Sequence, residues 1–430
     1  MKHSLSTFGR RLAMDSGIGE LMQDLGEVLA SGDEGLCMLG GGQPAHLPAV
    51  DRLWHERLQA IASDPNQVAS VLGDYQPPGG DASFREAVAR LFRREYGWPI
   101  DGENVCITAG GQTALFLLMN AFAGRFDDGT FKKVLLPLVP EYIGYADQST
   151  STDLFRAVRP NIEMTGPHEF KYHIDFESLK VDDSVAAICL SRPTNPSANV
   201  IGNDELTRLA DIASEKSVPL IVDNAYGDPF PGVIFTGTTP IWNPSMILTY
   251  SLSKLGLPGT RTGIVIADPE IVGYLSSMNA ITSLANNNIG QSMIRPLIES
   301  GEILSVSRDV IRPFYRDRSR QTKEWLSEAL DDSVPYRIHR SEGAFFLWLW
   351  LEGLPITSAE LYARLKRRGV LVISGHYFFF GLEDHQWNHR DECLRISFTT
   401  SESVLRRGIE ILADEVNQIF AAPSSDSASR

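Results

Sequence analysis

Short apolar runs alternate with amphipathic stretches through the middle of the chain. The stretches with helical spacing are 112–123 and 203–216, preceded by another at 83–96. The apolar runs have the length of buried strands and lie at 105–108, 134–137, 185–191, 219–223, 246–251 and 263–267. This alternation predicts an α/β fold in which helices cover both faces of a mainly parallel sheet.

The pattern changes near residue 300 to an α+β order. A long helix is predicted at 303–330, and the elements that follow are strands at 336–339, 344–350, 370–373 and 393–398 and helices at 358–367 and 401–419. At the other end, residues 1–36 have an apolar stripe at helical spacing, formed by Ile18, Leu21, Met22, Leu25, Val28 and Leu29. That stripe predicts an amphipathic arm that serves a core or an interface.

Polar and glycine residues gather directly after the predicted strands. They are Gly110, Gly111, Gln112, Glu141, Tyr142, Asn195, Asp223, Tyr226, Ser251, Ser253 and Lys254. Ligands of open α/β sheets bind at the carboxyl ends of the strands. We therefore expect one crevice to collect these side chains.

The stretch SLSKLGLPGTRTG, residues 251–263, contains the most distinctive candidate, Lys254. An amine is nucleophilic only when neutral, and burial or a nearby cation such as Arg261 favours the neutral form. Ser251 and Ser253 add hydroxyl donors and Arg261 a planar fork, which together suit a phosphate. A cofactor with both an aldehyde and a phosphate would fit the reactive amine and the phosphate-binding groups, and pyridoxal phosphate (PLP) is the obvious one. An ordinary loop with a solvated lysine is the alternative.

Several other positions suit the same cofactor. A buried Asp223 would keep the ring nitrogen protonated, and Asn195 and Tyr226 would donate to the ring oxygen, although a helix cap and an Asn-Pro turn are the simpler interpretations of Asp223 and Asn195. Gly110, Gly111 and Gln112 open a helix, whose free N–H groups favour a phosphate. Tyr142 would stack on the ring, or else belong to the core.

Arg395 stands inside an apolar strand, where an arginine requires an anionic partner. A substrate carboxylate would meet that requirement through two hydrogen bonds. The glycines of MLGGGQPAHLP, residues 38–48, permit close approach of the backbone near Gly42 to a ligand. Tyr75, in the turn DYQPPGG, is either a ligand contact or a plain loop aromatic.

Composition narrows the class of protein. A net charge of −15 argues against a general electrostatic attraction to nucleic acid or to an anionic membrane. The 4 cysteines lie far apart, which suggests a reducing compartment, and the longest apolar run, 344–351, is too short to span a bilayer. We therefore expect a cytoplasmic location. Asp384, His385 and His389 look like part of a solvated polar loop, so no metal site is predicted.

Taken together, the segments MLGGGQPA, LVPEYIGYAD, SRPTNPSANV, VDNAYGDPFPG, SLSKLGLPG, EGAFFLWLW and RRGVLVISGHYFF resemble the class I and II aminotransferases, fold-type I enzymes that depend on PLP. The resemblance runs along nearly the whole chain. It implies an arm and part of a small domain at 1–48, a large PLP-binding domain at 49–300, and the rest of the small α+β domain at 301–421. Residues 422–430 are small and polar and are expected to be a disordered tail.

The resemblance also implies roles for single residues. Lys254 would bond the cofactor and move the proton at the substrate Cα, Asp223 would pair with the ring nitrogen, and Asn195 and Tyr226 with the ring oxygen. Tyr142 would stack on the ring, and Arg395, with the backbone at Gly42, would take the substrate carboxylate. The expected phosphate ligands are Gly110, Gly111, Gln112, Ser251, Ser253, Arg261 and, from a neighbouring subunit, Tyr75. A tyrosine that crosses between subunits implies a homodimer with shared active sites.

Two departures from the family pattern concern the substrate and one turn. Between Glu270 and Ile294 the chain has no Arg or Lys for a second carboxylate, and Asn286–Asn288 lie there instead. A small neutral side chain on the amino donor is therefore expected, and the resemblance implies valine foremost, with pyruvate as acceptor. Ala198 stands where glycine is usual, so the turn there is expected to differ slightly. Aromatic or 2-aminoadipate transamination, a PLP lyase and a noncatalytic PLP sensor domain are the alternatives.

Overall fold

The computed structural model describes residues 3–14, 16–19, 22, 23, 26, 35–151, 153–383 and 387–422. Much of the predicted N-terminal stripe, including Leu21, Leu25, Val28 and Leu29, lies outside these ranges, as do Asp384, His385 and the tail 423–430. Within the arm, a short helix α1 (Thr7–Leu12) is present, Ile18 packs against the core, and Met22 is exposed.

A large mixed sheet forms the centre of the molecule. Its strand order is β2-β11-β10-β9-β8-β4-β3, with β5 beside β4. The bounds are β2 Val105–Thr108, β3 Gly124–Arg125, β4 Phe131–Leu136, β5 Phe155–Ala157, β8 Val185–Ser191, β9 Leu220–Asp223, β10 Met246–Ser251 and β11 Gly263–Ile266. The neighbours β10, β9, β8 and β4 are parallel, whereas β11 is antiparallel to both of its neighbours. The prediction of a mainly parallel α/β sheet is confirmed.

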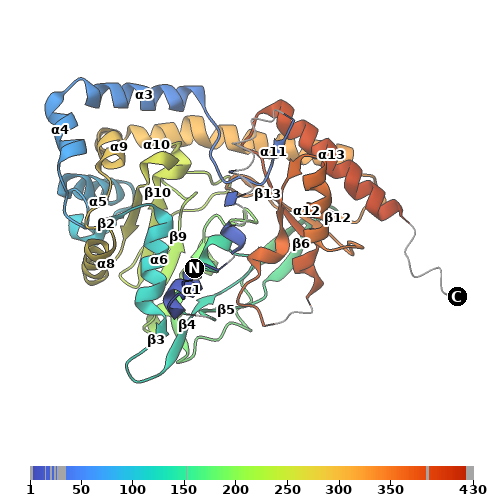
Figure 1. Cartoon of the computed structure of the whole chain (residues 1–430), viewed down its shortest axis with the longest axis horizontal. Coiled ribbons are helices and arrows are strands. Elements are labelled where there is room, and N and C mark those ends of the chain that lie inside the picture. The colour runs from blue at the N-terminus through green and yellow to red at the C-terminus, as the bar shows by residue number, and fades with distance from the viewer. Residues whose placement is uncertain are drawn as a thin grey trace.

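Helices cover this sheet on both sides (Figure 1). Helix α6 packs against β8, β10 and β11, and α5 and α8 pack against β2. The helices of this region are α3 Pro48–Ala62, α4 Pro65–Gly73, α5 Ala82–Tyr96, α6 Gly111–Phe122, α7 Asn203–Glu215, α8 Pro269–Thr282 and α9 Asn288–Ser300. Because both faces are covered, the central strands β8, β9 and β10 are buried along their whole length.

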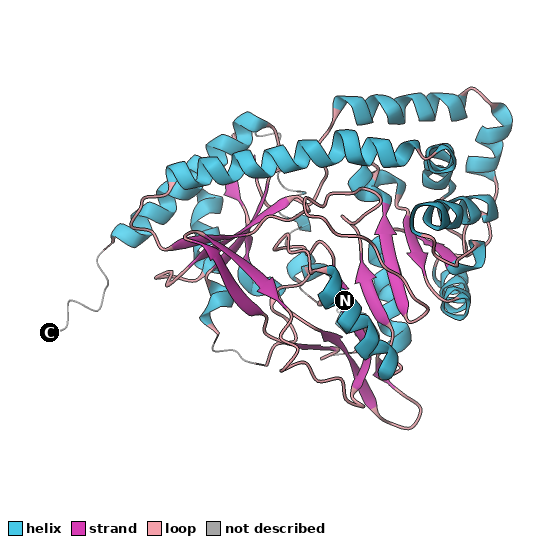
Figure 2. Ribbon diagram, turned by 180° about the vertical axis from the view of Figure 1, so that it is seen from behind, coloured by secondary structure: helices cyan, strands magenta, loops and turns pink. Residues whose placement is uncertain are grey.

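A second sheet lies beside the first (Figure 2). Its order is β15-β16-β13-β12-β7-β6. The bounds are β6 Asn161–Gly166, β7 Glu169–His173, β12 Tyr336–His339, β13 Phe346–Leu351, β15 Ile373–Ser374 and β16 Cys393–Ser397. Two of its strands, β6 and β7, therefore come from the middle of the chain. They were not predicted, because β6 is largely exposed and lacks an apolar run.

The helices of the C-terminal part pack on this second sheet and on each other. The predicted long helix is a continuous run of α10 (Glu302–Val306), a π turn (Ser307–Ile311) and α11 (Arg312–Ala329), and α11 packs along α13 (Glu402–Ala421). Helix α12 spans Ser358–Arg367. The N-terminal segment joins here, since β1 (Cys37–Met38) pairs with β14 (Val370–Leu371). The division into domains at residues 48, 300 and 421 stays a prediction.

Candidate active site

Three parallel strands end side by side at one edge of the large sheet. In the ladder Asp223 of β9 lies between Ser191 of β8 and Thr249 of β10. Lys254 follows within the 3-10 turn Leu252–Leu255, directly after β10. The strand ends therefore bring together residues that are far apart in the sequence, as the polar positions after the strands predicted.

Lys254 points from this turn toward the N-terminal segment. Its Nζ donates a hydrogen bond to the carbonyl oxygen of Gly42 at 2.6 Å and lies 5.3 Å from the centre of the Tyr226 ring. Burial lowers the pKa of Lys254 to about 8, and the positive charge of Arg395 adds to the effect, whereas Asp223 opposes it. A substantial part of this amine is therefore neutral near physiological pH.

Asp223 is buried and surrounded by hydrogen-bond donors. Its carboxylate accepts from the Tyr145 hydroxyl at 2.8 Å, the backbone N–H of Ala225 at 3.0 Å and the Thr249 hydroxyl at 3.2 Å. Burial raises the pKa of Asp223, while the Tyr145 hydrogen bond acts in the opposite direction. Tyr145 and Thr249 were not predicted as site residues. The spacing of Tyr145, three residues after Tyr142 in one turn, was the available signal.

Arg395 reaches the same place from the second sheet. It is 1% exposed on β16, and its guanidinium donates to Asn195 Oδ1 at 2.7 Å and to the Gly40 carbonyl at 2.5 Å. The group lies 4.2 Å from the centre of the Phe346 ring, and its Nε has no hydrogen-bond partner. Burial lowers the pKa of Arg395 to about 10. Among the described residues, no carboxylate forms an ion pair with this buried cation.

Hydrogen-bond donors for a phosphate converge at the start of α6. Gly110 has φ +93°, and a Cβ there would lie 2.4 Å from Nη2 of Arg261, so only glycine fits. Gly111 lies against Ser251, whose hydroxyl accepts from the backbone N–H of Ser253 at 3.2 Å. Arg261 itself is exposed. A helix N-terminus, hydroxyls and a guanidinium lie together here, and this combination suits an anion.

Aromatic rings line the remaining walls. Tyr142 stands edge-on to Tyr145 at 5.2 Å, and a Cβ on Gly144 would lie 2.3 Å from the Tyr142 ring. Gln112 donates to the Gly144 carbonyl at 3.1 Å, which connects α6 to this turn. Tyr226 is buried edge-on to Phe345 at 5.0 Å, and burial raises its pKa.

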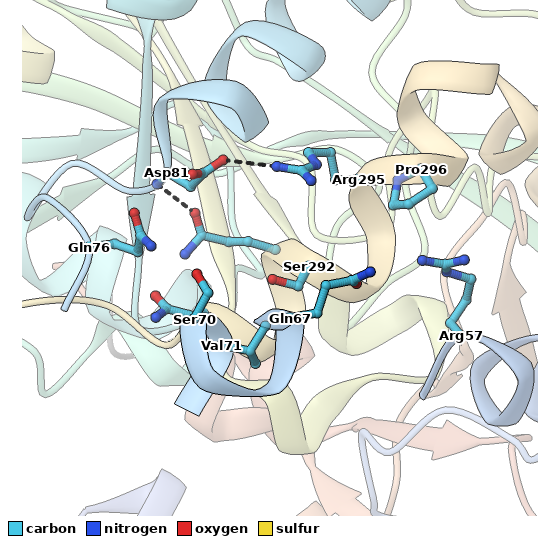
Figure 3. A pocket seen from close by; sticks show the side chains of 11 residues that line it. Arg57, Gln67, Ser70, Val71, Gln76, Asp81, Ser292, Arg295 and Pro296 are labelled. Atoms are coloured by element: carbon cyan, nitrogen blue, oxygen red, sulfur yellow. Dashed lines mark hydrogen bonds and ion pairs between the residues drawn. The ribbon is translucent and has the colours of Figure 1, made fainter. Parts of the chain in front are cut away.

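Tyr75 is the one predicted site residue that the structure leaves apart. It is 83% exposed on the loop after α4, and within the described chain no hydrogen bond links it to the other site residues. A cavity of about 120 Å³ opens near this loop between α3, α4 and α9, and Gln76, Asp81 and Arg295 are among the residues that line it (Figure 3). None of the predicted site residues lines that cavity.

The stretch near His389 differs from the prediction. His389 and Cys393 are buried rather than solvated, and the Tyr172 hydroxyl lies 2.5 Å from Nε2 of His389. Burial in this aromatic setting lowers the pKa of His389 to about 3. The prediction from the polar residues was wrong because the aromatic rings of Trp350, Phe379 and Trp387 pack around the imidazole of His389. Within the described ranges no three His, Cys, Asp or Glu side chains are grouped as metal ligands.

The structure shows the backbone conformation of the turn at Ala198. Ala198 adopts φ +60°, the left-handed conformation that glycine adopts easily. Its N–H donates to the Thr194 carbonyl at 2.8 Å, and the side chain is fully buried. Alanine therefore occupies a left-handed backbone position that glycine usually takes, and the buried surroundings hold it there.

This donor set fits PLP. An amine with a lowered pKa, a buried carboxylate and a group of anion-binding donors lie around one space, and the buried Arg395 offers an N–H group that lacks a partner. Residues 39–412 match the family model described as aminotransferase class I and II. The chain belongs to this family and is a PLP-dependent aminotransferase of fold type I, as predicted.

Particular relatives are similar along nearly the whole chain. The sequence is 44% identical to valine–pyruvate aminotransferase of Escherichia coli K12, over 97% of this chain and 99% of that protein. A crystal structure of valine–pyruvate aminotransferase from Salmonella typhimurium LT2 superposes with a TM-score of 0.86 at 44% identity, over 94% of this chain and 100% of that one. A putative amino-acid aminotransferase from Psychrobacter arcticum gives a TM-score of 0.95 at 39% identity, over 98% of this chain and 100% of that one.

Proposed function

We propose that this enzyme transfers the amino group of valine, or of a similar neutral L-amino acid, to pyruvate, giving 2-oxoisovalerate and L-alanine. The observation that carries the proposal is Arg395, a buried cation close to Lys254 that has no carboxylate partner among the residues that the structure describes. Such a guanidinium suits the α-carboxylate common to amino acids and 2-oxo acids. The names of the similar enzymes support valine and pyruvate as the pair. One site serves both half-reactions, so the kinetics should be ping-pong.

The residues of the chain divide the work as follows. When bound, PLP supplies an aldehyde that bonds amines and a protonated ring that withdraws electrons from the substrate Cα. Lys254 removes and returns the proton at Cα, and its lowered pKa provides the neutral amine for this. Asp223 holds the proton on the ring nitrogen, and Tyr145 and Thr249 hold Asp223 in place.

Binding groups surround this centre. Arg395 and the backbone at Gly42 orient the substrate carboxylate. Since Asn195 Oδ1 accepts from Arg395, its amide nitrogen remains for the ring oxygen, together with the Tyr226 hydroxyl. A set of donors at the start of α6 and the end of β10 would hold the phosphate, namely Gly111, Gln112, Ser251, Ser253 and Arg261. The backbone N–H of Gly110, also predicted here, instead donates to the carbonyl of Thr108 at 2.7 Å. Tyr142 would cover one face of the ring and exclude water from it.

Between Glu270 and Ile294, which cover most of α8 and the first half of α9, the chain has no Arg or Lys for a second carboxylate. Asn286 and Asn288 are committed to the backbone, since their amide groups donate to the carbonyls of Pro78 at 2.7 Å and Asp74 at 2.8 Å. This supports a neutral side chain over aspartate or 2-aminoadipate.

A homodimer with shared active sites is part of the proposal. Leu72, Tyr75, Ile281 and Leu284 are 77%, 83%, 85% and 59% exposed, an unusual concentration of bare apolar side chains. The Asn286 and Asn288 hydrogen bonds hold their two loops side by side. A second copy covering this patch would bury Tyr75 and carry it to the neighbouring phosphate site. Light scattering should give a dimer, and Ile281→Glu should shift the mass toward the monomer.

A cytoplasmic location completes the proposal. All 4 cysteines are free and buried, which suits a reducing compartment. Among the described helices, none is both long enough and apolar enough to cross a membrane.

A half-reaction scan tests the substrate assignment. Each amino acid is mixed with PLP-loaded enzyme, and the absorbance of the cofactor is followed together with the oxo acid formed. Valine and alanine should convert the cofactor stoichiometrically, and pyruvate should restore it. A response confined to aspartate, aromatic amino acids or 2-aminoadipate would overturn the proposed pair, and oxo acid without alanine in the presence of pyruvate would indicate a lyase.

A further inference from the structure

Glu141 is a fully buried carboxyl group that the chemistry above does not use. It is 0% exposed, between the end of β4 and the turn that carries Tyr142 and Tyr145. Burial raises its pKa to about 8, and Asp223 contributes a smaller effect in the same direction. Burying a carboxyl group costs folding free energy, so we expect the side chain of Glu141 to have a role here.

The two oxygens of Glu141 join two segments of the site. Oε1 accepts the backbone N–H of Ser191 at 2.7 Å, and Oε2 accepts the backbone N–H of Tyr142 at 3.0 Å and the Ser191 hydroxyl at 2.7 Å. Ser191 ends β8 and is followed within four residues by Asn195. The carboxyl group therefore fixes the Tyr142 turn relative to the segment that carries Asn195.

The backbone of Glu141 connects a third segment. Its N–H donates to the carbonyl of Phe378 at 2.9 Å. The Phe378 ring lies 5.6 Å from the guanidinium of Arg395. One residue thus holds together the ring-stacking tyrosine, the ring-oxygen donor and the surroundings of the carboxylate-binding arginine.

We propose that Glu141 is a positioning residue of the aminotransferase site, which holds Tyr142 and Tyr145 at the distance from Asn195 and Asp223 that cofactor binding requires. The surrounding groups favour this role. Tyr145 lies next to Asp223, and Cys189 and Asp223 are the other ionisable side chains close to Glu141. The Tyr142 ring tolerates little displacement, because it fits against the bare Cα of Gly144.

The carboxyl group does this in either protonation state. When ionised, both oxygens accept. When protonated, Oε2 donates its hydrogen to the Ser191 hydroxyl and still accepts from Tyr142. Glutamine has only one oxygen, so its NH₂ group must face the N–H of either Ser191 or Tyr142. Glu141→Gln therefore leaves one buried backbone N–H without an acceptor and moves the turn.

The test uses the full-length apoprotein titrated with PLP, with fluorescence and the cofactor spectrum as readouts. Glu141→Gln should weaken PLP binding about tenfold and shift the pH midpoint of the cofactor spectrum, since a lost hydrogen bond to a buried group costs about one decade. Glu415→Gln is the matched control, because Glu415 is a buried acid that pairs with Arg368 at 3.0 Å in the C-terminal part. The control should lose thermal stability with PLP affinity unchanged.

The outcomes are separable. If Glu141→Gln binds PLP with wild-type affinity and spectrum while its melting temperature falls as in the control, Glu141 is merely structural and the inference is overturned. Should Glu141→Gln fail to fold, Ser191→Ala removes one of the three donors and should weaken PLP binding about threefold; unchanged affinity there also overturns it. The inference rests on the aminotransferase assignment but not on valine, so a wild-type protein that fails to bind PLP would refute the proposed function instead.

Discussion

Two lysines of this chain, the buried Lys171 and the half-buried Lys254, show how surroundings decide what an amine does. Lys171, on β7, is 8% exposed and fully engaged, since it forms an ion pair with Glu342 and donates to Val200 O at 3.0 Å and Asn199 Oδ1 at 3.1 Å. Lys254 donates to one carbonyl, Gly42 O, and faces the cations Arg395 and Arg261. The first amine is a structural cation, whereas the second is poorly compensated and therefore reactive.

The largest effect is expected from removing the reactive amine. Lys254→Ala should lower turnover by roughly 10⁴-fold or more, because both the bond to PLP and the proton transfer at Cα are lost. Steady-state kinetics and the cofactor spectrum measure this. If the variant transaminated at a normal rate, the role given to Lys254 would be wrong.

The second largest loss of activity is expected from replacing Arg395, which lies close to the reactive lysine. Arg395→Lys should reduce kcat/KM for valine roughly 100-fold, because an ammonium cannot match a carboxylate with two parallel hydrogen bonds. Isobutylamine, which has the side chain of valine but no carboxylate, is the control. Its slow reaction should be the same in both proteins, and an equal loss for both amines would exclude a carboxylate contact.

The structural lysine should affect stability instead. Lys171→Met leaves Glu342 buried without its cation and should cost about 3 kcal/mol in the free energy of unfolding, with turnover per folded molecule preserved. Urea unfolding measures the cost. The double variant Lys171→Met/Glu342→Gln should recover part of it. Loss of turnover without loss of stability would contradict the contrast between the two lysines.

The smallest effect is a dependence of stability on pH in the apoprotein. Burial lowers the pKa of Lys254 to about 8, so between pH 8 and the ordinary lysine range the unfolded chain binds more protons than the fold does. Stability should therefore rise with pH across that window, by at most about 1.4 kcal/mol per unit from this group. Melting temperatures from pH 8 to 10 measure the slope. Lys254→Ala should show a smaller slope than wild type, and an identical slope would refute the shifted pKa.

Helices and strands were predictable from the sequence where the pattern of apolar residues was clear. The strands 105–108, 185–191 and 246–251 were predicted with their observed ends, because strands that are buried along their whole length are continuous apolar runs. The long C-terminal helix was predicted, but its π turn at Ser307–Ile311 was not, since one extra residue in a turn leaves the apolar spacing nearly unchanged. Strand β6 was missed because it is largely exposed, and β7 was missed because its partner β12 is more than 160 residues away along the chain.

The site was predictable in its residue types rather than in its contacts. The polar positions after the strands and the family resemblance pointed to Lys254, Asp223 and Arg395, and the structure brings these three together. The hydrogen bonds of Tyr145 to Asp223 and of Glu141 to Ser191 depend on which way two turns fold, which local sequence does not specify. The proposed position of Tyr75 depends on a second chain.

The second sheet takes β6 and β7 from residues 161–173, between strands β5 and β8 of the large sheet, and this affects how the protein can be made. A ribosome releases those two strands long before β12 is synthesised. Until then the backbone groups along one edge of β7 lack their hydrogen-bond partners. A gene cut at residue 300 would yield a C-terminal piece that exposes the bare edge of β12. Such halves should aggregate when expressed separately and recover an active enzyme only when they are produced together.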